Sequence, residues 1–172
     1  MDKNKNSKQK LAAELRERLS DAERIAIVGV GSELKGDDYA GVAIAHQLEK
    51  DQGALEKRPD VKIFIGGNAP ENITGEIKRF GPSHVIILDC ADMGRNAGES
   101  DLIDMEKIGG ASMDTHRLPM KMFAKYLFSC IECRIIIIGI QPKTLGFNLP
   151  ISEEVKAATN YVSSVIREVC KF

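Results

Sequence analysis

The sequence predicts a three-layer α/β/α sandwich in which a mostly parallel, twisted sheet carries helices on both faces. Four short runs rich in β-branched residues are almost continuously apolar, as expected of strands that are covered on both sides. Segments of helical length separate most of these runs. Alternating strands and helices favour parallel strands joined by helical crossovers, so the pattern indicates the α/β class.

Each element is predicted from a local pattern. Leu11, Leu15 and Leu19 are spaced four apart and indicate an amphipathic helix over residues 8–19, preceded by a polar tip, so that residues 1–10 are expected to be flexible. The predicted strands cover residues 24–30, 61–67, 84–90 and 134–140. The predicted helices cover residues 39–50, 70–80, 119–130 and 152–171. Pro70 and Pro119 fit the first turns of two of these helices.

Length and charge limit the classes of protein that fit. The chain of 172 residues predicts one domain, residues 1–172. Its 24 Lys and Arg against 25 Asp and Glu leave a net charge of −1, without the cationic excess that nucleic acid attracts. With aromatic residues at 5% and no Trp, few side chains can stack on bases. We therefore expect no nucleic-acid partner.

The apolar segments do not suggest export or membrane insertion. The polar N-terminus lacks the apolar block of a secretory signal. The apolar run Ile135–Ile140 is far shorter than the roughly 20 residues that cross a bilayer. We expect a cytoplasmic protein, a monomer, whose four cysteines are thiols.

An acidic pair follows the first predicted strand. Ligands of such sheets bind beyond the carboxyl ends of the strands, where Asp37 and Asp38 lie. A dinucleotide motif fails here because Leu34 replaces its third glycine, and two carboxylates disfavour a phosphate. The pair suits a cation instead, although either acid could cap the helix that begins near Tyr39.

The third predicted strand also ends in an acid. Asp89 follows four apolar residues, and a carboxylate so close to a buried sheet needs a hydrogen bond, an ion partner or a metal. Capping of the next loop is the alternative. Asp92 lies in a looser segment and is interpreted as a turn residue.

One of the three histidines can complete a metal site. His116 lies in a polar loop before a predicted helix and can reach the carboxyl edge of the sheet. His46, within a helix, and His84, at the opposite edge, are interpreted as structural. Two carboxylates and one imidazole would bind a borderline ion such as Zn²⁺ or Ni²⁺ and leave open coordination positions. One acid of the pair, Asp37 or Asp38, together with Asp89 and His116, therefore forms the predicted ligand set.

The CxxC sequence at Cys130 and Cys133 is a weaker candidate. It closes a predicted helix, whereas a thioredoxin-like pair opens one. A structural zinc site would need a second pair, and Cys90 and Cys170 do not have that spacing. We expect no redox or zinc role for this motif.

Five separated segments carry a resemblance to a known family, in this order along the chain: GVGSELKGDDYAGV, GGNAPEN, ILDCADMGRNAGE, THRLP and GIQPKTLGFNLPISEEVK. From about Arg24 to the C-terminus, the chain resembles the hydrogenase maturation endopeptidases of the hydrogenase-3 type. The resemblance implies a compact α/β/α fold related to the phosphorylase/hydrolase architecture. It also implies removal of a C-terminal extension from the large-subunit precursor of a [NiFe] hydrogenase after nickel insertion.

The resemblance also implies roles for particular residues. Asp38, Asp89 and His116 match the family's metal-binding positions and are the predicted catalytic residues, in a metal-dependent or aspartic-type peptidase. The ion would be the Ni²⁺ of the substrate, for which Zn²⁺ or Cd²⁺ can substitute in crystals. Further substrate contacts are predicted for Asn68, Asp37 and Thr115.

Two departures from the family's pattern and two alternative functions accompany this prediction. Ser32 stands where the family usually has Asn, and Tyr39 where it usually has Gly, so substrate fit is affected more than the ligands. A non-catalytic nickel-binding accessory protein could use the same three ligands. A nucleotide-dependent α/β enzyme would instead be stabilised by NAD or ATP.

Overall fold

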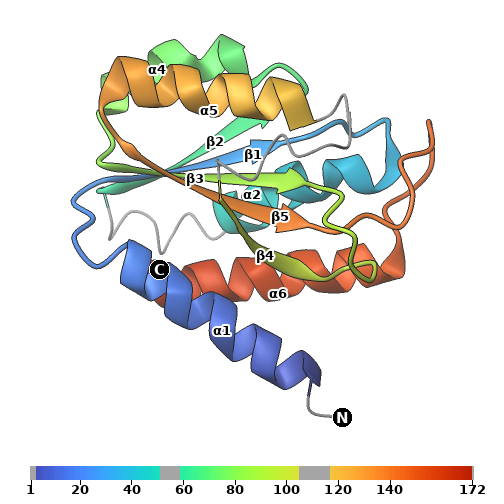
Figure 1. The fold of residues 1–172 in the computed structure, drawn as a ribbon. Helices are drawn as coiled ribbons and strands as arrows, with labels where there is room; N and C mark the ends of the chain where they lie inside the picture. The colour runs from blue at the N-terminus through green and yellow to red at the C-terminus, as the bar shows by residue number, and fades with distance from the viewer. Residues whose placement is uncertain (1–2, 51–58, 105–116, 172) are drawn as a thin grey trace.

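The computed structural model describes residues 3–50, 59–104 and 117–171, which form one five-stranded sheet with helices on both faces (Figure 1). The order of the strands is β2-β1-β3-β5-β4, and all neighbours are parallel except β4 and β5. The strands are β1 (Ile25–Val30), β2 (Val61–Gly67), β3 (His84–Cys90), β4 (Ser100–Ile103) and β5 (Arg134–Ile140).

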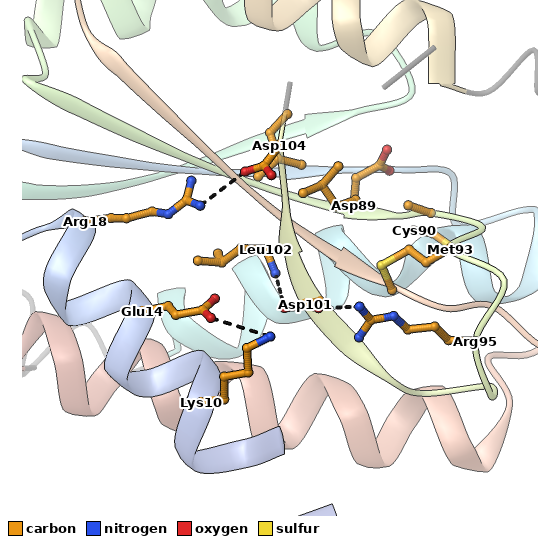
Figure 2. A pocket seen from close by; sticks show the side chains of 13 residues that line it. Lys10, Glu14, Arg18, Asp89, Cys90, Met93, Arg95, Asp101, Leu102 and Asp104 are labelled. Carbon is orange, nitrogen blue, oxygen red and sulfur yellow. Dashed lines mark hydrogen bonds and ion pairs between the residues drawn. The ribbon is translucent and has the colours of Figure 1, made fainter. Parts of the chain in front are cut away.

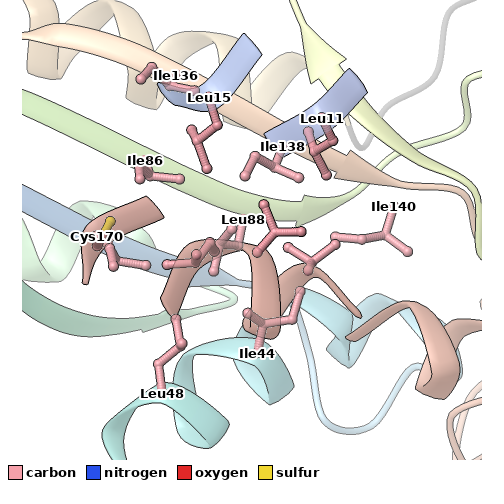
Figure 3. Close-up of a cluster of buried hydrophobic side chains, with 14 of the residues drawn as sticks. Leu11, Leu15, Ile44, Leu48, Ile86, Leu88, Ile136, Ile138, Ile140 and Cys170 are labelled. Atoms are coloured by element: carbon pink, nitrogen blue, oxygen red, sulfur yellow. The ribbon is translucent and has the colours of Figure 1, made fainter. Parts of the chain in front are cut away.

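Helices cover the two faces of the sheet and bury a separate apolar cluster on each. The larger cluster joins α1 (Lys3–Arg18), α2 (Ala40–Glu49) and α6 (Glu153–Cys170) to side chains such as Ile86, Leu88 and Ile138 (Figure 3). The second cluster lies under α4 (Thr74–Phe80) and α5 (Arg117–Ile131) and takes up the alternate positions Val85, Ile87 and Ile137. Because successive strand residues point to opposite faces, each central strand supplies both clusters.

The structure confirms the predicted α/β class and three strand ranges to the residue. The predicted helix over residues 70–80 is divided into a 3-10 turn, η2 (Pro70–Ile73), and α4. The first helix begins at Lys3, five residues before the predicted start. One strand was not predicted: β4 is a short antiparallel edge strand paired with β5.

The remaining expectations concern cysteines and membranes. None of Cys90, Cys130, Cys133 and Cys170, all within the described residues, forms a disulfide. No helix in the described parts of the chain is long and apolar enough to span a bilayer.

The packing of α2 against the sheet depends on two glycines. A Cβ at Gly41 would lie 2.1 Å from the carbonyl oxygen of Leu88, and one at Gly29 would lie 2.6 Å from Ala45 Cβ. Only glycine allows such an approach of a helix to a strand. The start of α2 is therefore held directly against the carboxyl end of β3.

Candidate active site

The order of the strands reverses at β1. The chain passes from β1 to β2 on one side and then crosses to β3 on the other side. In open α/β sheets the crevice at such a switch point, outside the carboxyl ends of the strands, is the usual binding site. Asp38, in the 3-10 turn η1 (Gly36–Tyr39) after β1, and Asp89, near the end of β3, both lie at this edge.

Asp38 is held by the glycine turn that follows β1. The backbone N–H of Ser32 donates a 2.9 Å hydrogen bond to Asp38 Oδ2. Gly31 has a φ of +131°, and a Cβ there would lie only 1.7 Å from the carbonyl oxygen of Asp38. The turn thus requires glycine at position 31. Ser32 contributes its backbone N–H to the acid, so the replacement of Asn by Ser leaves this contact in place.

Asp89 is electrostatically coupled to Asp38. Burial raises the pKa of the Asp89 carboxyl well above its usual range, and the nearby charge of Asp38 raises it further, against a smaller opposing effect from a hydrogen bond with the Cys90 backbone. The structure therefore brings together two of the three predicted ligands. Carboxyl groups with unequal environments are typical of sites that perform acid–base chemistry.

Asp37 points into the protein, in contrast to Asp38. It is completely buried, and its oxygens accept hydrogen bonds from the backbone N–H groups of Lys143, Thr144 and Ser152 at 2.8, 2.9 and 2.6 Å. The Ser152 hydroxyl adds a fourth at 3.0 Å. Burial alone would raise the pKa of Asp37, but these hydrogen bonds outweigh it and lower the pKa.

The helix-capping alternative for the acidic pair is not observed. No side chain caps η1, and none caps α2, whose first flanking residue is Tyr39. Asp37 instead ties the loop after β1 to the β5–α6 loop, residues 141–152. A direct contact between its buried carboxylate and the substrate does not fit this placement, so any effect of Asp37 on the substrate passes through the two loops.

A pocket of about 530 Å³ opens beside Asp89, between β4 and α1 (Figure 2). Its wall carries three ion pairs: Arg95 with Asp101, Arg18 with Asp104 at 3.3 Å, and Lys10 with Glu14 at 3.6 Å. We call the carboxyl edge of the sheet around Asp38 and Asp89 the acidic edge. The pocket is therefore a groove of mixed charge that reaches this edge at Asp89. Sequence reasoning missed this groove because β4, which forms part of its wall, was not predicted.

Gln141 is a second feature that the sequence did not reveal. This side chain is only 7% exposed, and its Oε1 accepts hydrogen bonds from the backbone N–H groups of Met93 and Arg95 at 2.7 and 3.2 Å. Its Nε2 donates to Asp92 Oδ1, which also accepts from the N–H of Gly94. Asp92 is thus the turn residue that was predicted, and Gln141 positions the loop that follows Asp89.

Of the remaining predicted site residues, the structure describes Asn68. Asn68 is exposed in the turn after β2, and the bond from Gly31 N–H to the Gly67 carbonyl, 2.9 Å, places this turn beside the first loop. His116 and Thr115 lie outside the described residues. Within the described ranges, no three His, Cys, Asp or Glu side chains are arranged to hold a metal.

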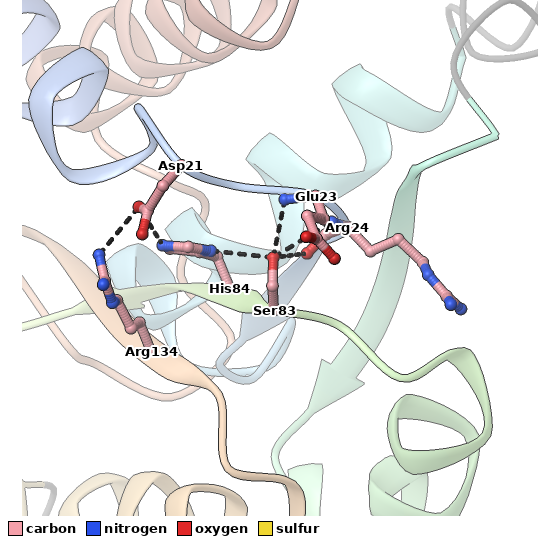
Figure 4. A network of polar contacts seen from close by, with 6 residues as sticks. All are labelled: Asp21, Glu23, Arg24, Ser83, His84 and Arg134. Atoms are coloured by element: carbon pink, nitrogen blue, oxygen red, sulfur yellow. Dashed lines mark hydrogen bonds and ion pairs between the residues drawn. The ribbon is translucent and has the colours of Figure 1, made fainter.

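His84 and His46 lie in structural settings. The ring of His84 contacts Ser83 Oγ at 3.0 Å and lies 3.6 Å from Asp21, at the amino edge of the sheet (Figure 4). This order of Ser, His and Asp is not a nucleophilic triad, because Ser83 Oγ already donates to the carbonyl of Arg24 and accepts two backbone N–H groups. His46 faces Glu49 one turn along α2, at 3.4 Å.

The CxxC residues also lie away from the acidic edge. Cys133 is 1% exposed, and burial raises the pKa of its thiol. A thiol that keeps its proton is a poor nucleophile, so Cys133 is a poor candidate for attack on a disulfide.

The fold and the paired acids at its switch point define an α/β protein with a carboxylate site at the carboxyl edge of the sheet. The family profile of the HycI hydrogenase maturation proteases matches residues 42–169. This chain belongs to the hydrogenase maturation protease family.

Individual relatives agree with this assignment. The chain is 35% identical to a proposed hydrogenase maturation protease of Methanocaldococcus jannaschii over 158 residues, which cover 90% of this chain and 93% of that protein. It is 34% identical to the hydrogenase 3 maturation protease of Escherichia coli K12 over 134 residues, 77% and 82% of the two chains. The crystal structure of the [NiFe] hydrogenase maturation protease HycI from Thermococcus kodakarensis superposes with a TM-score of 0.82 at 34% identity, covering 92% of this chain and 99% of that one.

Proposed function

We propose that this protein is an endopeptidase that removes the C-terminal extension of a [NiFe] hydrogenase large-subunit precursor after nickel insertion. Family membership supports a peptidase that acts on hydrogenase precursors. The observation that carries the proposal is the coupling of Asp38 and Asp89 at the switch point of the sheet, because it supplies paired carboxyl groups where a substrate can reach them.

The substrate's nickel is the recognition element in this proposal. Two neighbouring carboxyl groups are suitable donors for a divalent ion, and an imidazole would complete a mixed oxygen and nitrogen set. His116 is the proposed third ligand. It directly precedes Arg117, where α5 begins, and α5 runs back along the sheet to the start of β5, so its first turn lies toward the acidic edge. The ion arrives with the precursor and leaves with the product.

Peptide hydrolysis at this edge needs an activated water and a proton for the leaving amine. The raised pKa of Asp89 suits a carboxylate that takes a proton from the attacking water and passes it to the amine nitrogen, a role that a ligand of the ion can still perform through its second oxygen. The water is activated either by the substrate's metal or by a carboxylate acting as general base. Asn68, exposed next to the glycine turn, is proposed to bind the extended tail.

The test mixes the purified protein with nickel-loaded precursor and follows the loss of the tail by mass spectrometry. We expect one cleavage, with release of an intact C-terminal peptide, and no cleavage of nickel-free precursor. Binding without cleavage would instead identify a nickel-binding accessory protein. Cleavage that persists with nickel-free precursor would disprove the role of the metal as a recognition element while preserving the peptidase.

We also propose that the protein acts in the cytoplasm and as a monomer. A cytoplasmic location fits a substrate that is processed during assembly, and fractionation of cells with an antibody against this chain tests it. Sedimentation of the purified protein tests whether it acts as a monomer.

A further inference from the structure

Four large apolar side chains are exposed on two loops at the carboxyl edge of the sheet. Phe147 is 74% exposed, Leu34 57%, Leu149 46% and Leu145 37%. We name these four residues the edge patch. Single exposed apolar residues are ordinary on protein surfaces, whereas a contiguous group beside a site marks an interaction surface.

Contacts between the two loops make the edge patch one surface. Asn148 lies between Phe147 and Leu149 in the sequence, and its backbone N–H donates a 2.7 Å hydrogen bond to the carbonyl of Leu34. Gly36, with a φ of +53°, lies beneath this junction, and a Cβ there would be 3.7 Å from Leu149 Cβ. The loop after β1 and the β5–α6 loop, orange in Figure 1, thus lie side by side.

Polar anchors hold the edge patch in this arrangement. The buried carboxylate of Asp37 binds the β5–α6 loop at both ends, through Lys143 and Thr144 before the patch residues and through Ser152 after them. A surface that is ordered before it meets a partner loses less conformational entropy on binding. The anchoring therefore favours a docking role over an incidental exposure of apolar residues.

Charged groups surround the edge patch. Glu33 and Lys35 are exposed on either side of Leu34, and Lys143 pairs with Glu154 at 2.7 Å near the base of the loop. An apolar centre with a polar rim is the usual anatomy of a protein–protein interface. The edge patch therefore fits a folded protein partner.

We infer that the edge patch docks the folded body of the precursor whose tail is cleaved, through an apolar surface next to its C-terminal extension. The inference depends on the proposed function. Leu34 precedes Asp38 by four residues, so a protein seated on the edge patch brings its chain end to the acidic edge. A second copy of this chain seated there would cover that edge and block the substrate.

The decisive variants remove apolar surface from either loop. Phe147→Ser changes the β5–α6 loop and Leu34→Ser changes the loop after β1. Phe128→Ser is the matched control, because Phe128 is 59% exposed on α5, near the end that leads into the amino edge of the sheet. Thermal melting confirms that each variant is folded before binding and cleavage of nickel-loaded precursor are measured.

We expect Phe147→Ser and Leu34→Ser each to weaken precursor binding and raise KM by about tenfold, with kcat at saturation within about twofold of wild type. Phe128→Ser should match wild type. Unchanged binding and KM in both patch variants would overturn the docking role while leaving the peptidase intact.

Two further outcomes separate this inference from the proposed function. A wild-type protein that binds the precursor through the edge patch without cutting it would disprove the peptidase and uphold the docking surface. A wild-type dimer that dissociates on Phe147→Ser, measured by sedimentation, would assign the patch to a second copy and overturn the inference.

Discussion

Asp37 and Ser152, 115 residues apart, are joined by two hydrogen bonds: the Ser152 backbone N–H donates to Oδ1 at 2.6 Å and its hydroxyl donates to Oδ2 at 3.0 Å. Ser152 directly precedes α6, and Asp37 lies in the turn before α2. The pair therefore connects the starts of two helices that pack on the same face of the sheet. It also explains why Ser152 does not use its hydroxyl to cap α6.

Asp37→Asn is expected to destabilise the protein strongly. The amide keeps the shape of the side chain but loses the charge and turns one acceptor into a donor that faces N–H groups. We expect a loss of about 2–4 kcal/mol in the free energy of unfolding, measured by urea titration. An unchanged midpoint would show that these hydrogen bonds do not hold the loops. Asp92→Asn, whose carboxylate lies in a surface turn, is the matched control.

The pH dependence of the free energy of unfolding should also show the contribution of the Asp37 carboxylate. The pKa of Asp37 is lowered in the folded state, so its stabilising effect is complete above the unfolded pKa of about 3.9 and is lost as the pH falls through the folded value. The free energy of unfolding of the wild type should therefore fall below about pH 4. In Asp37→Asn this fall should be smaller, and an equal fall in both proteins would argue against the assignment.

Asp38→Asn and Asp89→Asn should each remain folded and lose processing of the precursor. Each removes one carboxylate from the acidic edge, and we expect the rate to drop by at least about a hundredfold, close to 3 kcal/mol in activation free energy. Single-turnover cleavage followed by mass measures the effect. His46→Gln and Cys130→Ser should process at the wild-type rate. Wild-type cleavage by either aspartate variant would place the reaction elsewhere.

Asp89→Asn should also gain stability near neutral pH. The raised pKa of Asp89 means that the fold favours its protonated form, so its ionisation costs stability as the pH rises from the unfolded pKa through the folded one. A neutral amide avoids that cost. At pH 7 the melting temperature of the variant should exceed that of the wild type by about 2–4 °C for each kcal/mol gained in the free energy of unfolding. Below about pH 4 the two melting temperatures should become equal. A lower melting temperature at pH 7 would contradict the raised pKa.

Gly41→Ala should disturb the acidic edge from a distance. The added Cβ would lie 2.1 Å from the carbonyl of Leu88 and force α2 away from the end of β3. We expect a loss of about 1–3 kcal/mol in stability and slower processing, because Asp38 and Asp89 no longer keep their spacing. Gly75→Ala is the control, since a Cβ there meets nothing within 4 Å. Equal stability of the two variants would refute the close contact.

The central strands could be predicted because burial on both faces leaves a clear sequence pattern. The ranges 61–67, 84–90 and 134–140 were correct to the residue. Strand β4 has only four residues, all of them partly exposed, and includes Asp101 and a serine, so neither continuous apolarity nor alternation marked it. Its position is set by pairing with β5, which local sequence does not encode.

The acidic edge was predictable in part for a similar reason. Acids at strand ends are visible in the sequence, and the parallel topology brings Asp38 and Asp89 together. The inward orientation of Asp37 was not predictable, because its partners are mostly backbone N–H groups more than a hundred residues away. Such donors are present at every residue except proline and leave no mark in a sequence.

The opposite orientations of Asp37 and Asp38 make the length of their turn more critical than its composition. These neighbours lie in a 3-10 turn, where each residue rotates by about 120° around the axis. Inserting one residue before the pair would move Gly36 to the interior position and Asp37 to the rim, so the interior would lose its anion. Deleting one would move Asp38 to the interior and Tyr39 to the rim, so the rim would lose its acid. Loop grafts between homologues should therefore keep the residue count from Gly31 to Asp38 unchanged, even where exposed side chains such as Glu33 and Lys35 are replaced.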